Sequence, residues 1–147
     1  MFIRENPCPV LRIHHALAKP WRIPGRTELP TKSTPVHIEN LTRGTTVVSA
    51  GRVADRFWPR LIGLMLARPL PAGAGLVIVP CSSIHTQFMR FPIDVLYVNK
   101  QDEIVGIDRN LRPWRIGRFY KKVHYVVELP AGGAEGCQVG DSVKIAG

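Results

Sequence analysis

The sequence predicts a small, mainly-β single domain, shaped as a barrel or a sandwich, with one short helix. The chain has 147 residues, which is the length of one ordinary domain. About seven short segments alternate apolar and polar residues or are rich in β-branched residues, and turn-forming residues separate them. Short strands at close spacing are typical of barrels and sandwiches.

The first half of the domain is expected to begin with a hairpin. Residues 36–41 alternate apolar and polar side chains, residues 45–50 are β-branched or small, and the Thr-Arg-Gly between them is a turn. The helix is predicted over 56–66, because Asp55 can cap it and apolar side chains recur at helical spacing. A buried strand is predicted over 75–80, an apolar segment between a glycine and a proline.

The second half is predicted to hold four more strands. Residues 93–98 and 103–107 form a hairpin around the turn Asn-Lys-Gln-Asp. A further strand covers 123–129, and the last one covers 142–145 after a Gly-Asp turn. Pro113 and Gly117 argue against a long helix in the intervening segment, which is therefore expected to be a loop or a short strand with a loop.

Residues 1–35 are expected to form an extended or disordered arm, and residues 36–147 the domain. Proline has no amide donor and disfavours a helical conformation of the residue before it. The arm is unusually rich in this residue; it contains Pro7, Pro9, Pro20, Pro24, Pro30 and Pro35.

Charge and cysteine content suggest a basic protein of the bacterial cytoplasm. The formal net charge is +9, which indicates an anionic partner without identifying it. The three cysteines, Cys8, Cys81 and Cys137, cannot all pair with one another, so we expect reduced thiols. No apolar segment approaches the roughly 20 residues of a membrane span, and the first residues lack the pattern of a secretion signal.

The central segment contains three side chains of metal-ligating type, Cys81, His85 and Met89, which lie four residues apart. These side chains would suit copper or zinc. However, Thr86 and the flanking prolines favour an extended chain, in which four residues span about 13 Å. Metal bonds are only about 2.0–2.3 Å long, so we predict no metal and no other cofactor.

Two carboxylates, Asp94 and Glu128, lie in otherwise apolar predicted strands. A buried carboxylate is unfavourable unless it is paired or hydrogen-bonded. A structural partner would be a backbone amide or an arginine such as Arg90; a functional interpretation places both carboxylates in a polar pocket. The residues of this candidate pocket are His85, Met89, Asp94, Trp114 and Glu128.

A basic segment precedes the predicted strand at 123–129. It has no acidic residue and interleaves its cations with Trp114, Phe119 and Tyr120, a combination that suits phosphates and bases. An anionic small ligand or an acidic protein surface would fit equally, and Trp114 could alternatively fill the barrel. The candidate anion-binding residues are Arg109, Arg112, Arg115, Arg118, Lys121 and Lys122.

Several blocks, in matching order and spacing, resemble the domain-of-unknown-function 192 family of small bacterial and archaeal proteins over roughly residues 36–146. The blocks are residues 60–65, 70–76, 83–95, 112–114, 128–132 and 139–143. The resemblance implies a small β-barrel-like domain and no established activity. His85-Thr86 is similar to one subgroup of the family, and Phe88 stands where many members carry Trp.

The leading functional hypothesis is a non-enzymatic binding or accessory module with a site around His85–Asp94, for an unknown small ligand or protein. One alternative is a small hydrolase-type enzyme that uses His85 with Asp94 or Glu128, although no residue is assigned as catalytic. The other is binding of nucleic acid, or of another anion, through Arg109–Lys122. Nucleic acid is compatible with the sequence but is not the favoured partner.

Overall fold

The computed structural model describes residues 35–55 and 64–147. All but the last residue of the predicted arm lies outside this part of the chain, as does most of the helix predicted over 56–66. The three residues of that helix that are described, 64–66, form a turn instead, and Leu66 has a φ of 57°. A positive φ is incompatible with an α-helix.

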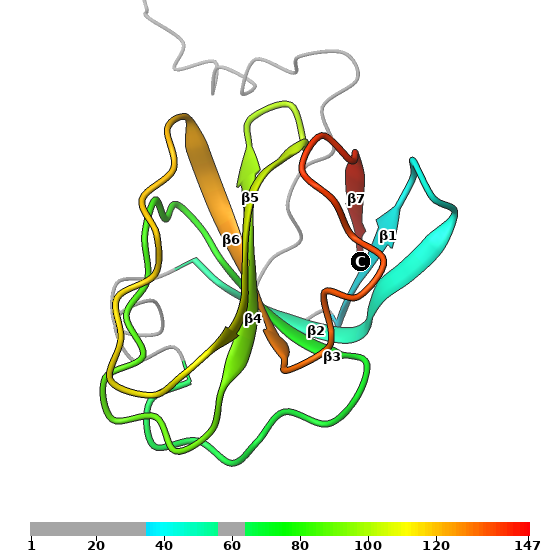
Figure 1. The fold of residues 1–147 in the computed structure, drawn as a ribbon. Coiled ribbons are helices and arrows are strands. Elements are labelled where there is room, and N and C mark those ends of the chain that lie inside the picture. The colour runs from blue at the N-terminus through cyan, green and yellow to red at the C-terminus, as the bar shows by residue number, and fades with distance from the viewer. Residues whose placement is uncertain (1–34, 56–63) are drawn as a thin grey trace, which may run out of the picture.

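Seven strands in the described part of the chain form one curled sheet, a half-barrel (Figure 1). The sheet order is β5-β4-β6-β3-β2-β1-β7. The strands are β1 (Val36–Asn40), β2 (Thr45–Ala54), β3 (Ala74–Ile78), β4 (Ile93–Asn99), β5 (Ile104–Leu111), β6 (Val123–Pro130) and β7 (Val143–Ala146). The mainly-β class and each predicted strand are therefore confirmed.

The two predicted hairpins, β1–β2 and β4–β5, are both antiparallel, as expected. β2 and β5 extend farther than the sequence predicts, and both extensions contain residues of low strand propensity. The end of β2 pairs in parallel with β3, from Ala50 opposite Ala74 to Ala54 opposite Ile78. Pairing with a neighbouring strand thus overrides the weak local preference.

The concave face of the sheet carries the inner core, to which every strand contributes. It includes Ile38, Val48, Val77, Leu96, Ile104, Val127 and Val143. The edge strands β5 and β7 approach each other at one end, where Ile104 N donates to Asp141 O at 2.9 Å and Val143 N donates to Asp102 O at 2.8 Å. The half-barrel is thereby partly closed.

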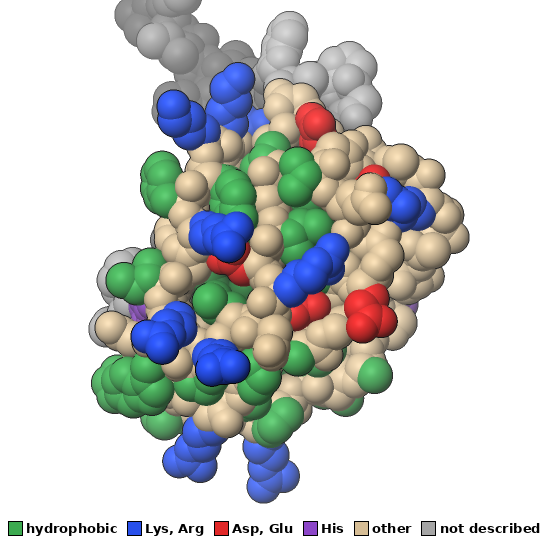
Figure 2. All heavy atoms as spheres, viewed as in Figure 1, with side chains coloured by type: hydrophobic (Ala, Val, Ile, Leu, Met, Phe, Trp, Pro, Cys, Tyr) green, Lys and Arg blue, Asp and Glu red, His purple; other side chains and the backbone are tan. Residues whose placement is uncertain are grey.

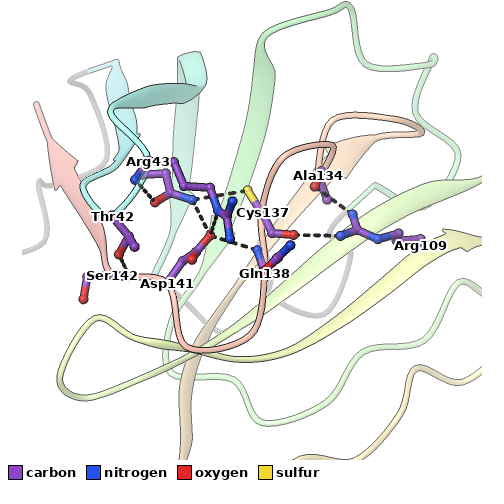
Figure 3. Close-up of polar contacts among 9 residues, drawn as sticks. Thr42, Arg43, Arg109, Ala134, Cys137, Gln138, Asp141 and Ser142 are labelled. Atoms are coloured by element: carbon purple, nitrogen blue, oxygen red, sulfur yellow. Dashed lines mark hydrogen bonds and ion pairs between the residues drawn. The ribbon is translucent and has the colours of Figure 1, made fainter.

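A polar cluster secures the turn between β1 and β2 to the loop before β7 (Figure 3). Asp141 Oδ2 accepts from Arg43 Nε at 2.6 Å, from Asn40 Nδ2 at 2.8 Å and from Gln138 N at 2.9 Å. The hydrogen bond from Arg43, which is the main cause, lowers the pKa of Asp141 to about 2. These contacts hold β7 in place.

The opposite face of the sheet carries the outer core, built around Leu76, Ile78, Val95, Tyr97 and Val126. Two long loops cover it: the central loop, residues 79–92, and the basic loop, residues 112–122 (Figure 1). The central loop contributes the buried side chains Ile84, Met89 and Phe91. An apolar outer face exists only because these loops exclude water from it.

The extended conformation predicted for the central segment is wrong. The chain turns at residues 87–88, where Met89 N donates to Thr86 O at 3.3 Å and Phe88 has a φ of 61°. The reason is that Thr86 bonds to the basic loop, far away in sequence, instead of to a neighbouring strand.

Candidate functional site

Thr86 joins the central loop to the basic loop. Its Oγ1 donates to Arg112 O at 2.7 Å and accepts from Arg115 N at 2.9 Å. Its backbone N donates to Arg115 O at 2.8 Å, and its backbone O accepts from Trp114 N at 2.9 Å. The two surfaces that the sequence suggested separately therefore form one continuous surface, which we call the joined-loop surface (residues 84–91 and 108–119).

Two aromatic side chains, Phe88 and Trp114, meet on this surface. Their ring centroids lie 4.8 Å apart in an edge arrangement, and the side chains are 47% and 60% exposed. Both residues have a positive φ, 61° for Phe88 and 60° for Trp114. Such a backbone is unfavourable for a residue with a bulky side chain, and strain of this kind clusters at functional sites. Because Trp114 is so exposed, it does not fill the barrel.

The same surface holds an open groove of about 550 Å³, the arginine groove; its lining includes Arg112 and Arg115 on either side of Trp114 in the chain, but neither aromatic ring. Its lining residues are Ile107, Asp108, Arg109, Asn110, Leu111, Arg112, Arg115, Ile116 and Arg118. Figure 2 shows basic and hydrophobic side chains interspersed over the lower left of this view, where the yellow loop after β5 runs in Figure 1.

The four arginines of the groove differ in how firmly hydrogen bonds and ion pairs hold their guanidinium groups. Arg109 is fixed, because its guanidinium donates to Ala134 O and Cys137 O, both at 2.7 Å (Figure 3). Arg112 and Arg115 are exposed. Arg118 is also exposed and lies 3.6 Å from Asp108, a distance that gives little attraction in water. Among the described residues, Arg112 and Arg115 thus present guanidinium groups without a side-chain partner, whereas Arg118 is paired with Asp108.

Asp108 is the one acidic residue among those that line the groove in the described structure, and Oδ1 accepts from Tyr120 OH at 3.4 Å. Oδ2 accepts from Tyr97 OH at 3.0 Å and from Arg118 N at 2.7 Å. Burial, with Asp108 as a second cause, raises the pKa of Tyr97, so the phenol stays a donor. Gly117 permits this contact, because a Cβ there would collide with the Tyr97 hydroxyl. Asp108 therefore holds the basic loop against the sheet.

Backbone amides hydrogen-bond to both oxygens of the Asp94 carboxylate. Oδ1 accepts from Asn110 N at 2.8 Å, and Oδ2 accepts from Gly132 N at 3.1 Å and Ala134 N at 3.0 Å. Backbone amides, rather than Arg90, thus satisfy this carboxylate. These hydrogen bonds connect the loop after β6 to β4 and to the last residues of β5.

Glu128 lies on the other face of the sheet from Asp94, because Asp94 pairs with Leu129 and adjacent strand residues point to opposite faces. Its cross-strand neighbours are Leu76 and Val95, both in the outer core. The residue is only 3% exposed, and Oε2 has no hydrogen-bond partner among the described residues. Burial raises the pKa of Glu128 to about 7.

His85 and Met89 belong to the central loop but point to different environments. His85 is exposed and forms a β-bridge with Ile116, whereas Met89 is buried in the outer core. His85 hydrogen-bonds to neither Asp94 nor Glu128. Of the predicted pocket, the structure joins His85, Met89 and Trp114 through the two loops, and it places the two carboxylates elsewhere on the sheet.

Lys121 and Lys122 are exposed but do not line the groove. Within the described residues, no three His, Cys, Asp or Glu side chains gather in a way that could hold a metal ion. The same part of the chain contains no helix that is long and apolar enough to cross a membrane.

Sequence reasoning placed Thr86 and Phe88 within the candidate segment His85–Asp94 but did not name either as a site residue. Thr86 bonds to residues 26 and 29 positions away, and no local pattern announces such a contact. The one available signal is composition: Phe88 is a large apolar residue in a segment with several polar residues that ends in proline. An irregular loop with an exposed ring is compatible with that pattern.

Comparison with known proteins places the fold in context. A family model, DUF192 ("Uncharacterized ACR"), matches residues 38–145. A UPF0127 protein of Pyrococcus furiosus is 33% identical over 112 residues, which cover 71% of this chain and 94% of that protein.

Two crystal structures have a similar fold. A protein of unknown function from Novosphingobium aromaticivorans has a TM-score of 0.66 at 20% identity, and the match covers 75% of this chain and 83% of that one. A protein from Sinorhizobium meliloti has a TM-score of 0.64 at 24% identity, over 74% of this chain and 90% of that one.

Proposed function

The chain belongs to the DUF192 family, and from this premise we propose that it is a non-enzymatic binding module whose joined-loop surface takes an anionic ligand or partner. The observation that carries the proposal is the arginine groove on the same surface as the strained, exposed pair Phe88 and Trp114. Three exposed guanidinium groups line a hollow in which the sole carboxylate of the described lining is already hydrogen-bonded. Arginine is the side chain best suited to bind phosphate or carboxylate groups in two-point contacts.

This surface takes in most of the segment that the sequence suggested as a site, His85–Asp94, and adds the basic loop, but it does not include Asp94. The acid–base alternative has less support. Asp94 is occupied by three backbone amides, and Glu128 lies in the outer core without a hydrogen bond to His85. A general base must come within hydrogen-bond reach of the group that it serves.

A cytoplasmic location is part of the proposal. Cys137 is buried and forms no disulfide with any described residue, which fits a reducing compartment.

The test uses inorganic polyphosphate as the probe and calorimetry as the measurement. The wild-type chain should bind it, and binding should weaken as salt is raised. In the double variant R112A/R115A we expect an affinity loss of about tenfold or more, because two charge-assisted contacts are removed.

The matched control is K100A/K144A, which removes the same charge from exposed positions outside the groove. Its affinity should stay within about twofold of the wild type, since distant exposed charges are screened. The proposal fails if polyphosphate does not bind, or if the two double variants lose affinity equally.

A further inference from the structure

We infer that the anionic partner is single-stranded nucleic acid, whose phosphates bind the arginine groove while its bases stack on Trp114 and Phe88. The inference rests on the proposed function and names the partner of that same surface. It goes beyond anion binding because it assigns a role to the aromatic rings as well as to the arginines.

The charges of the groove suit a phosphate backbone. Arg112, Arg115 and Arg118 are exposed, and the basic loop continues past the groove with Lys121 and Lys122. The Asp108 carboxylate is engaged within the protein, since Oδ2 accepts from Tyr97 OH and Arg118 N, and Oδ1 accepts from Tyr120 OH at 3.4 Å. A row of cations along a chain segment matches a polymer of phosphates better than it matches one small anion.

The aromatic rings distinguish a nucleic acid from other polyanions. Trp114 and Phe88 are held at the surface by backbone in the left-handed region, and Trp114 N is fixed by its bond to Thr86 O. The fold itself gains little from a ring that remains mostly in water. Exposed rings beside cations form the usual platform on which successive bases stack.

The same rings favour a single strand. In a duplex the bases are already stacked on one another, so a protein ring reaches their faces only after unstacking them. An acidic peptide would satisfy the arginines, but its carboxylates provide no flat surface to cover the two rings. Phe119, on the same loop and 75% exposed, offers a further apolar contact along the strand.

The experiment measures fluorescence anisotropy of a labelled DNA or RNA single strand of about 12 nucleotides, with the full chain and a duplex of the same sequence. We expect the single strand to bind more tightly than the duplex. W114A should weaken single-strand binding by about tenfold, and W114F, which keeps a ring, should recover most of the loss. R112A/R115A should lower the slope of log affinity against log salt by about 1.4.

The matched control for W114A is L41A, which shortens an exposed apolar side chain in the turn between β1 and β2. It should bind the single strand like the wild type. W114A should also bind polyphosphate like the wild type, because that probe has no bases to stack.

The outcomes separate the inference from the proposed function. If polyphosphate binds but W114A leaves single-strand affinity unchanged, or if the duplex binds as well as the single strand, the nucleic-acid inference fails and anion binding stands. If poly-glutamate displaces the oligonucleotide at equal charge, the partner is an acidic protein surface and the inference is overturned. If no polyanion binds, both fail.

Discussion

Replacing Glu128 by Gln should remove a specific pH dependence of stability. Glu128 lies between Leu76 and Val95 in the outer core, and Oε2 has no partner among the described residues. Burial raises its pKa from 4.5 to about 7. Because the folded-state pKa is the higher one, folding favours the protonated carboxyl. The stability from this group is fully present below about pH 4.5 and is lost as pH rises through about 7.

The size of the effect follows from the two pKa values. Each pH unit between them corresponds to about 1.4 kcal/mol, so the ionisation of Glu128 should lower the free energy of unfolding by about 3 kcal/mol in alkaline solution. In E128Q the neutral amide keeps the shape of the protonated side chain and does not titrate. The variant should therefore lack this decrease, and above about pH 8 it should be the more stable protein.

The assay is urea unfolding at several values between about pH 5 and pH 9, with the free energy of unfolding taken from each curve. Glu135 is exposed, and E135Q serves as the matched control that should retain the wild-type pH dependence. A wild-type stability that stays constant over this range would refute the reasoning. So would a decrease of the same size in E128Q, since another group would then be responsible.

Three further substitutions test contacts described above. D141N should lower the melting temperature at neutral pH, because it weakens the contact with Arg43. Since the pKa of Asp141 is lowered to about 2, the variant should also lose less stability than the wild type between about pH 4 and pH 2. An acid transition identical to that of the wild type would contradict this reasoning. T86V leaves Arg115 N without its side-chain acceptor and should cost about 1–3 kcal/mol in urea unfolding, whereas T86S should be near wild type. G117A forces a Cβ against a buried tyrosine hydroxyl, so it should shift the basic loop and weaken polyphosphate binding in calorimetry; wild-type affinity would show that the loop tolerates the shift.

The strands could be predicted from sequence because their signal is local. The alternation in β1 reflects burial of one face of the sheet, and the apolar segment of β3 reflects burial of both faces. Both patterns can be recognised from residues that are one or two positions apart. The extension of β2 to Ala54 could not be predicted in this way. Gly51 and Ala54 are poor strand residues, and they are extended because β3 pairs with them in parallel.

The site was predictable in its residue types but not in its assembly. The cations of the basic loop, with Trp114 among them, are visible in the sequence, and so are the two carboxylates in apolar strands. What the sequence could not supply is register. Asp94 pairs with Leu129, one residue after Glu128, so the two carboxylates lie on opposite faces of the sheet. The two loops are joined by a hydrogen bond from the Thr86 hydroxyl to a residue 26 positions away.

Removing the ring of Trp114 tests whether this side chain serves binding or stabilises the fold. If its ring were a structural plug, W114A would open a cavity and cost about 3–5 kcal/mol, the usual loss for a buried aromatic side chain. In the structure the side chain is 60% exposed and contacts Phe88 at the surface, so W114A should change the free energy of unfolding by less than about 1 kcal/mol. Urea unfolding measures this directly, with W114F as the variant that retains a ring. A large destabilisation by W114A would mean that the ring supports the loops, and its strained backbone would then need no ligand to explain it.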